Sequence, residues 1–349
     1  MIKLKDRVDA FVHLGKFLAK FSKKYIDEHG VENDEFNNLI KSIHIYNGWF
    51  TEENVRLSLI AISEMLKPEN LEKWISRYPN LSDNNTVRTI GVVTAGNIPL
   101  VGFHDMLCVL ISGNIFKAKL SSKDNKLMFA IRSFLISINP EFEELIIFEE
   151  NKLVGFDAVI ATGSNNTSRY FDYYFGKYPN IIRKNRSSIA VLTGKESKDE
   201  IAALADDIFM YFGLGCRNVS KLLVPENYCF DNFFKNIEHY SDIYKHNKYA
   251  NNYDYNKSIY LMNKVQHLDN GFVVLKEDEG MSSPIAVLYF QYYKTIEDVN
   301  KFIALNSHNI QCVVSGNREV SDSLDFGKAQ YPELWDYADN IDTMKFLMT

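Results

Sequence analysis

One of the four cysteines of the sequence lies in a setting that suits a nucleophile. Cys216 occurs in YFGLGCRNVSK, residues 211–221, just past the end of an apolar helical pattern. The thiolate is the reactive form of cysteine, and nearby cations or backbone N–H groups lower the pKa of the thiol. Arg217 and Lys221 could supply that charge, and Gly215 leaves room for a substrate. A buried structural cysteine is the alternative for this loop; the other three lie in runs typical of a core, at Cys108, Cys229 and Cys312.

A second candidate is a turn between a predicted strand and a predicted helix. In VIATGSNNTSRYFDYYF, residues 159–175, the turn is made by Thr162, Gly163 and Ser164. The start of a helix offers backbone N–H groups and the positive end of the helix dipole, both of which suit a pyrophosphate. The stretch has neither the G-x-G-x-x-G nor the P-loop pattern, so an ordinary capped helix is the alternative.

Two more loops follow predicted strands. In TAGNIPL, residues 94–100, the amide of Asn97 could donate a hydrogen bond to an oxyanion, or could cap the next helix. In FKAKLSSKD, residues 116–124, Lys119 and Ser121 end a strand where the ribose or phosphate of a nucleotide would lie. A solvated loop is the alternative for this second segment.

These loops need a scaffold, and short apolar strands alternate with helices along the chain. Strands are predicted over 87–93, 114–120, 144–149, 157–162 and 188–192, with helices over 100–113 and 125–138. A second run of strands and helices begins at about residue 195. Such alternation is typical of parallel sheets covered by helices on both faces, with ligands at the carboxyl ends of the strands.

Composition excludes several classes of function. The chain has 349 residues and a net charge of −6, which argues against a nucleic-acid-binding or polybasic membrane surface. No apolar run approaches the roughly 18 residues of a membrane span, and the N-terminus lacks the apolar core of a secretory signal. Widely spaced cysteines and the lack of Cys/His clusters indicate free thiols in the cytoplasm and no metal site.

Five segments, in the correct order, resemble motifs of the aldehyde dehydrogenase superfamily. They are AGNIPL, similar to W-N-F-P-L; FKAKLSS, similar to V-x-K-P-S-E; VIATGSNNTSRYF, similar to F-T-G-S; GLGCRN, similar to G-Q-x-C; and EDEGMSSPIAVLYF, similar to E-E-x-F-G-P. Within the superfamily, GLGCRNVSK and the tail FGKAQYPELWDYADNIDTMKFL resemble the long-chain acyl-CoA reductases that supply fatty aldehyde to bacterial luminescence. The similarity runs from about residue 80 to the C-terminus.

The resemblance implies an aldehyde-dehydrogenase-like α/β fold with two open, parallel-type sheet domains and a helical N-terminal region. Helical spacing of apolar residues over 5–75 predicts the helical N-terminal region, 1–80, with Thr51 as a helix cap. The remaining regions are 81–192, binding a nucleotide cofactor; 193–325, catalytic; and 326–349, a tail. We expect residues 78–86 to mark the first boundary. The tail is expected to pack back on the cofactor domain or on a partner subunit.

The resemblance also implies roles for individual residues. Cys216 matches the covalent nucleophile, and Asn97 with the Cys216 N–H matches the oxyanion hole. The turn at Thr162, Gly163 and Ser164 matches the pyrophosphate site, and Lys119 and Ser121 match contacts to the adenosine ribose. Glu279 lies one position from the glutamate that binds the nicotinamide ribose, because Gly280 occupies the usual place.

Two departures from the superfamily pattern shape the expected activity. Aldehyde-oxidising members have a glutamate in E-L-G-G-K, where this chain has RKNRSSIAV, with Asn185 or Arg186 in its place. Without that base, water should attack a thioester poorly, whereas CoA brings its own thiol. Ser122, followed by Lys123, replaces the glutamate that repels a 2′-phosphate, which favours NADPH while leaving NADH possible.

The expected activity is reduction of an acyl-CoA to an aldehyde by a cytoplasmic enzyme. An acyl-carrier or acyl-transfer protein is the other donor considered, and the chain is a candidate homo-oligomer. Alternatives are a CoA-acylating aldehyde dehydrogenase, an acyl phosphate reductase, or a silent partner subunit. The general acid is not identified; His104, His267 and His308 are candidates by residue type alone. The RKNR cluster at 183–186 suits either phosphates or a surface turn.

Overall fold

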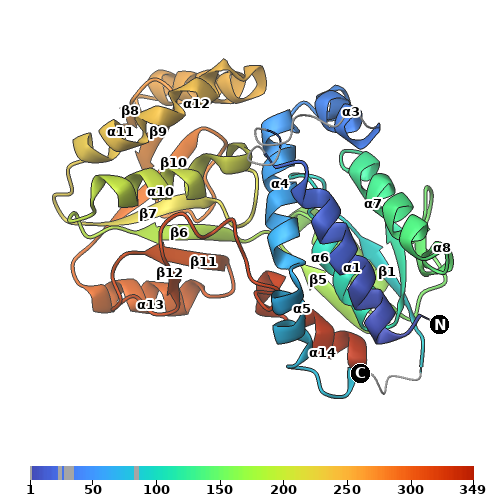
Figure 1. Ribbon diagram of the computed structural model, residues 1–349. Coiled ribbons are helices and arrows are strands. Elements are labelled where there is room, and N and C mark those ends of the chain that lie inside the picture. The colour runs from blue at the N-terminus through green and yellow to red at the C-terminus, as the bar shows by residue number, and fades with distance from the viewer. Residues whose placement is uncertain (1, 23–25, 27–34, 82–85) are drawn as a thin grey trace. The chain divides into compact units, whose positions relative to one another are not determined.

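The computed structural model describes residues 2–22, 26, 35–81 and 86–349. The chain forms two compact units. The first contains Met1–Lys184 and Glu333–Thr349, and the second contains Asn185–Pro332. Each unit is built on a sheet (Figure 1).

The sheet of the first unit has five parallel strands in the order β3-β2-β1-β4-β5. The strands are β1 (Thr89–Val93), β2 (Ile115–Lys119), β3 (Ile146–Phe148), β4 (Ala158–Thr162) and β5 (Asn180–Arg183). Their side chains include the fully buried Ile90, Val92, Phe116 and Ile160. The four strands predicted in this region are present, and β5 had not been predicted.

Helices cover this sheet, and most of them share one hydrophobic core with it. They are α1 (Leu4–Ala19), α3 (Glu35–Ser42), α4 (Glu52–Met65), α5 (Pro68–Ile75), α6 (Phe103–Ile111), α7 (Asn125–Ile138), α8 (Phe142–Leu145), α9 (Asn165–Phe175) and α14 (Thr343–Met348). Thr51 caps α4 as expected, because its hydroxyl accepts a hydrogen bond of 3.2 Å from the Asn54 N–H.

The N-terminal helices do not form a separate region. Phe11 of α1 and Leu59 of α4 are fully buried in the same core as Ile90 of β1. The expected boundary at 78–86 is therefore not a division between the two units, and residues 82–85 lie outside the described part of the chain. The apolar faces of α1 and α4 need the sheet layer to be buried, which a local polar break cannot reveal.

The C-terminal residues return to the first unit, held by buried polar groups. The Arg183 guanidinium donates hydrogen bonds of 2.7 and 2.8 Å to the Asp105 carboxylate, and another of 3.1 Å to the Thr343 hydroxyl. Arg88 donates to the Leu347 carbonyl at 2.6 Å, near the end of α14. Residues 326–332, predicted as part of this tail, belong instead to the second unit, where Phe326 is buried.

The second unit contains a seven-stranded sheet in the order β12-β11-β6-β7-β10-β9-β8, parallel except between β8 and β9. The strands are β6 (Ser187–Val191), β7 (Val219–Pro225), β8 (Leu268–Asp269), β9 (Val274–Glu277), β10 (Val287–Tyr293), β11 (Ile310–Ser315) and β12 (Ser323–Leu324). Because β6 pairs with β7 and β11, residues 185–192 belong here and not with 81–192 as predicted. An apolar run predicts that a segment forms a strand, but it does not predict which strands that segment pairs with in the sheet.

Helices lie on both faces of this second sheet (Figure 1). They are α10 (Lys198–Phe209), α11 (Asp231–Ile237), α12 (Asn247–Met262) and α13 (Ile296–Asn306). Residues of α10 and α11 pack with Leu222 and Val224 on one face, and residues of α13 pack with Leu223 on the other. Because successive side chains of a strand point to opposite faces of the sheet, the side chains of β7 contribute alternately to two hydrophobic cores.

The buried Arg183–Asp105 pair predicts a large stability effect. Asp105→Ala should lower the free energy of unfolding by about 3–5 kcal/mol, because it leaves a buried guanidinium without its carboxylate. Urea denaturation followed by tryptophan fluorescence would measure it, because Trp49, Trp74 and Trp335 all lie in the same unit. The matched control is Asp325→Ala, which breaks an exposed pair with Arg318 and should cost less than about 1 kcal/mol. Equal effects of the two variants would contradict the prediction.

Candidate active site

Three candidate loops of the first unit begin at the same edge of its sheet. β1 lies between β2 and β4, and Val93 of β1 is in register with Lys119 and with Ala161. The segments that follow these strands therefore start side by side at the carboxyl ends. Thr94 joins two of them, since its hydroxyl accepts from the Ser121 N–H at 3.1 Å.

The loop that bears Asn97 is fixed through its backbone. Its Pro99 carbonyl accepts a hydrogen bond of 2.8 Å from the Ser58 hydroxyl, and Leu100 adopts a positive φ of 58°. The backbone N–H groups of Leu100 and Val101 form hydrogen bonds to the buried Asp124 carboxyl, whose pKa is nevertheless raised well above its usual range by burial. Sequence reasoning missed Asp124.

The candidate ribose contacts lie on the neighbouring loop. The Lys119 ammonium donates to the Glu150 carbonyl at 3.3 Å and to the Asn151 carbonyl, both beyond the end of β3. Ser121 is half-buried, and the side chain of Ser122 is exposed. Ser122 is thus accessible to a charged group of a ligand.

The turn at 162–164 connects β4 to α9, as expected. Ser164 caps the helix, because its hydroxyl accepts a hydrogen bond of 3.2 Å from the Thr167 N–H. A Cβ on Gly163 would lie 2.8 Å from the Phe171 ring and 3.0 Å from the Thr167 Cβ, so only glycine fits. A helix N-terminus, an exposed serine and a tightly packed glycine at the end of a strand together fit a dinucleotide phosphate.

The Cys216 loop lies in the second unit, and the side chain of Asn218 organises it. Asn218 is buried, and its side-chain oxygen accepts from the Gly215 N–H at 2.8 Å. Its side-chain nitrogen donates to the Met210 carbonyl at 2.9 Å and to the Asp207 carbonyl at 3.1 Å, at the end of α10. One amide therefore holds both ends of the connection from α10 to Cys216.

The backbone of Cys216 is fixed while its side chain is exposed. The Ser188 hydroxyl of β6 donates to the Cys216 carbonyl at 3.0 Å and accepts from the Cys312 N–H at 3.2 Å. Cys108 is buried, and burial raises the pKa of its thiol well above the usual value. Cys229 is exposed, so its expected place in the core was wrong.

A segment near the end of the second unit is tied to the same loop. The Asp207 carboxylate accepts from the Gly327 N–H at 2.6 Å and from the Ala329 N–H at 2.9 Å. The Arg217 guanidinium, next to Cys216, donates to the Ala329 carbonyl. Burial is the main cause that raises the pKa of Asp207 to about 6.

Glu279 is exposed on the connection between β9 and β10. The carbonyls on either side of it, at Asp278 and Gly280, accept hydrogen bonds of 2.8 and 3.2 Å from the Lys221 ammonium. Ser220 donates to the Met281 carbonyl at 2.7 Å. Lys221, expected to supply charge to Cys216, thus binds this connection.

The candidate general acids and the RKNR cluster have other contacts. His104 is half-buried, its Nε2 lies 3.0 Å from the Leu334 carbonyl, and desolvation lowers its pKa. His267 and His308 contact the Val265 carbonyl and the Asn309 amide at 2.8 and 3.0 Å. Arg183 is in its ion pair with Asp105, so this arginine is not part of a surface turn.

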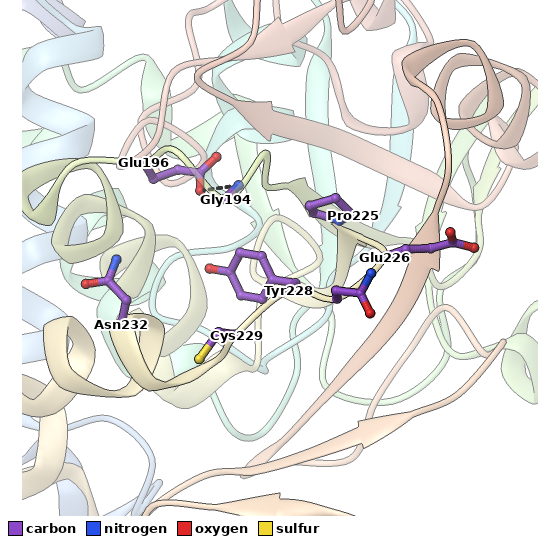
Figure 2. A pocket seen from close by; sticks show the side chains of 8 residues that line it. Gly194, Glu196, Pro225, Glu226, Tyr228, Cys229 and Asn232 are labelled. Atoms are coloured by element: carbon purple, nitrogen blue, oxygen red, sulfur yellow. Dashed lines mark hydrogen bonds between the residues drawn. The ribbon is translucent and has the colours of Figure 1, made fainter.

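A pocket of about 270 Å³ opens at the carboxyl ends of β6 and β7 (Figure 2). Its lining is Gly194, Glu196, Pro225, Glu226, Asn227, Tyr228, Cys229 and Asn232, none of which was predicted as a site residue. Cys216 precedes β7 and therefore lies near the amino end of that strand, opposite the end at which this pocket opens. The expectation of ligands at carboxyl ends therefore suits the candidate loops of the first unit but not Cys216.

A small pocket borders both flanks of the Cys216 loop. It has a volume of about 30 Å³, and Gly213 and Val219 contribute to its wall together with Phe212, Tyr249 and Pro284.

Within the described ranges, no group of three or more His, Cys, Asp or Glu side chains could hold a metal ion. No helix in the described part of the chain is long and apolar enough to cross a membrane.

The fold is that of aldehyde dehydrogenases. Aldehyde dehydrogenase 21 from Physcomitrella patens, solved with succinate, is 12% identical, with a TM-score of 0.67 over 100% of this chain and 84% of that one. The GapN glyceraldehyde-3-phosphate dehydrogenase from Methanocaldococcus jannaschii, solved with NADP, is 12% identical, with a TM-score of 0.61 over 94% and 79%. The NAD-dependent aldehyde dehydrogenase from Sinorhizobium meliloti is 13% identical, with a TM-score of 0.61 over 92% and 72%. At these identities the likeness concerns the fold alone.

The family follows from the sequence match. The model of the family described as acyl-CoA reductase (LuxC) matches residues 3–238, more than half of the chain. The chain therefore belongs to the acyl-CoA reductase (LuxC) family, and the predicted family and fold class are confirmed. This membership and the fold support an oxidoreductase acting on an aldehyde or a thioester. No curated protein matches the chain in sequence.

The raised pKa of Asp207 predicts a pH-dependent stability. Because its native pKa of about 6 exceeds the unfolded value of 3.8, the native state binds the extra proton between these pH values. The stability that proton binding by Asp207 contributes is present below about pH 4 and is lost as the pH rises through about 6. Relative to Asp207→Asn, the wild type should gain up to about 3 kcal/mol on going from pH 7 to pH 4.

Denaturant unfolding of both proteins at the two pH values would measure this difference. The control is Asp206→Asn, the adjacent half-buried carboxylate, which accepts from the Tyr240 hydroxyl at 2.7 Å and should not reproduce the effect. A pH-independent difference between the wild type and Asp207→Asn would show that the native pKa of Asp207 is not raised above its unfolded value.

Proposed function

We propose that the protein reduces an acyl-CoA thioester, or the same thioester on a carrier or acyl-transfer protein, to an aldehyde through an S-acyl intermediate on Cys216. The observation that carries the proposal is an exposed cysteine on a loop whose backbone is fixed by Asn218 and Ser188. Membership of the acyl-CoA reductase family supports the choice of substrate.

In the proposed reaction, the Cys216 thiolate attacks the acyl carbonyl. A carbon–sulfur bond to Cys216 forms, the bond to CoA breaks, and CoA leaves as a thiolate that takes up a proton. The Asn97 amide and the Cys216 N–H stabilise the oxyanions, by ~3 kcal/mol for each donor. After hydride addition, the hemithioacetal on Cys216 collapses to the aldehyde and restores the thiolate. Two easier steps thus replace one difficult step.

A nicotinamide dinucleotide supplies the hydride when bound. In this proposal the turn at 162–164 holds its pyrophosphate, Lys119 and Ser121 contact the adenosine ribose, and Glu279 contacts the nicotinamide ribose. The exposed Ser122 leaves room for a 2′-phosphate beside Lys123, so NADPH is the preferred form and NADH a weaker one. The first unit is thus proposed to bind the cofactor and the second to carry the nucleophile.

The proposal favours reduction over the alternatives. Asn185 and Arg186 stand where an oxidising relative would have its hydrolytic glutamate, so transfer to water should be slow. The CoA-acylating oxidation uses the same residues in reverse and is the second candidate. The exposure of Cys216 argues against a silent partner subunit. A reaction that depends on a thiolate suits the reducing cytoplasm.

Cys216→Ala should abolish acyl-enzyme formation while leaving NADPH binding intact, because only the thiol forms the bond. Mass spectrometry of the intact protein, mixed with a panel of acyl-CoAs without cofactor, would detect the adduct. The wild-type adduct should disappear on addition of NADPH, with release of aldehyde. Cys229→Ala is the matched control, since Cys229 is also exposed but its removal should leave formation of the adduct unchanged. An adduct that persists in Cys216→Ala would refute the assignment.

Ser122→Glu should weaken NADPH binding by at least about tenfold and NADH binding by less than about threefold, because the new carboxylate repels only the 2′-phosphate. Fluorescence titration of each cofactor would measure both dissociation constants. Ser133→Glu, an exposed position on α7 of the same unit, is the charge control and should change neither. Equal weakening of both cofactors by Ser122→Glu would place the 2′-phosphate elsewhere.

A further inference from the structure

The connection that bears Glu279 has an unusual path. β9 ends at Glu277 and β10 begins at Val287, and the two strands are adjacent and parallel. A crossover between parallel strands usually needs a dozen or more residues and contains a helix. Here residues 278–286 make the crossover without a helix. Their backbone groups must therefore find partners outside a helix or strand.

Lys221 supplies two of those partners. Its side chain is fully buried in β7, and its ammonium donates to the carbonyls of Asp278 at 2.8 Å and Gly280 at 3.2 Å. The ammonium also lies 5.4 Å from the centre of the Phe302 ring of α13. The two bonded carbonyls are those immediately before and after Glu279. The backbone on both sides of Glu279 is thus bound to one buried ammonium.

The charged groups around Lys221 belong to the same crossover. Asp278 and Glu279 favour the charged ammonium, but burial is the larger effect and lowers the pKa of Lys221 to about 8. The Asp278 carboxylate is itself engaged by the Lys276 ammonium and by the Gly280 N–H at 2.7 Å. Lys276 therefore binds the Asp278 side chain, whereas Lys221 binds the backbone.

The beginning of β7 also holds the nucleophile loop. β7 begins at Val219, directly after Asn218, which accepts from the Gly215 N–H. The next residue, Ser220, donates to the Met281 carbonyl of the crossover. Within residues 218–221, Asn218 thus binds the Cys216 loop, whereas Ser220 and Lys221 bind the crossover.

We infer that Lys221 is a positioning residue, which fixes the crossover so that Glu279 keeps its place relative to Cys216 for the nicotinamide ribose of the cofactor. The inference rests on the proposed function in assigning the crossover to the cofactor. It adds a requirement that the proposed function does not contain, namely that one buried ammonium sets the shape of this part of the site.

The first test compares Lys221→Met with the wild type in two assays. The dissociation constant of NADPH, from fluorescence titration, should rise about tenfold, because a charge-assisted pair of hydrogen bonds is lost. The rate of acyl-adduct formation without cofactor should stay within about twofold, because Asn218 and Ser188 still hold the Cys216 loop. Lys276→Met, the matched control, should change neither value by more than about twofold.

The wild type provides a second test that does not depend on how a variant folds. Above pH 8 the Lys221 ammonium loses its proton and donates weaker hydrogen bonds. In the Cys216→Ala background, NADPH should therefore bind about threefold or more weakly at pH 9.5 than at pH 7. Lys221→Arg, which remains charged, should abolish this dependence.

A merely structural lysine would give a different pH profile. Because the native pKa of Lys221 lies below its unfolded value of 10.5, its linkage contribution to stability rises between pH 8 and 10.5. The inference thus predicts that cofactor affinity falls over a range in which this contribution to stability increases. An NADPH affinity that rises together with global stability over this pH range would overturn the inference.

The outcomes separate this inference from the proposed function. If the wild type forms no acyl adduct, the proposed reaction fails, yet the ratio of NADPH dissociation constants still tests Lys221. If adducts form and Lys221→Met binds NADPH as the wild type does, the inference fails alone. Parallel loss of acylation and binding, or a wild type that binds neither NADPH nor NADH, would also overturn it.

Discussion

The candidate site depends on one constraint: a backbone group buried outside a helix or strand still needs a hydrogen-bond partner. Asn218 meets it at the end of α10, where its amide binds two carbonyls and one N–H of the chain leading to Cys216. Lys221 meets it in the crossover between β9 and β10. In the first unit, Asp124 accepts from the backbone of the Asn97 loop. Each irregular loop is shaped by a buried polar side chain, which for the crossover and the Asn97 loop comes from another segment.

Much of the fold could be predicted because apolar runs reveal strands and helices directly. α7 begins and ends at the predicted residues, 125 and 138, and β4 lies within the predicted 157–162. The placement of β6 could not be predicted, because strand pairing is decided by the whole sheet. α12 was missed because its buried tyrosines at 249, 253 and 260 are diluted by asparagines, which weakens the helical pattern.

The site was only partly predictable for a related reason. Motifs located Asn97 and Cys216 because both lie in short loops with recognisable sequences. Residues that support them act on segments far away in sequence: Ser188 lies 28 residues from the Cys216 carbonyl that it binds, and Lys221 lies 57 residues from Asp278. The available clue was a polar residue within an apolar strand, such as Lys221 in SKLLVP, because a buried lysine must have partners.

The turn before Cys216 shows how the chain supports an exposed cysteine. Tyr211 and Phe212 both adopt positive φ angles, 54° and 60°, which costs of order 1–2 kcal/mol for each non-glycine residue. Both side chains are buried, so glycine at either position would relieve backbone strain but remove core packing. The strain follows from the sharp change of direction between α10 and the start of β7. Burial of two aromatic rings and the bonds to Asn218 offset it, and the Cys216 side chain is left facing solvent on a fixed backbone.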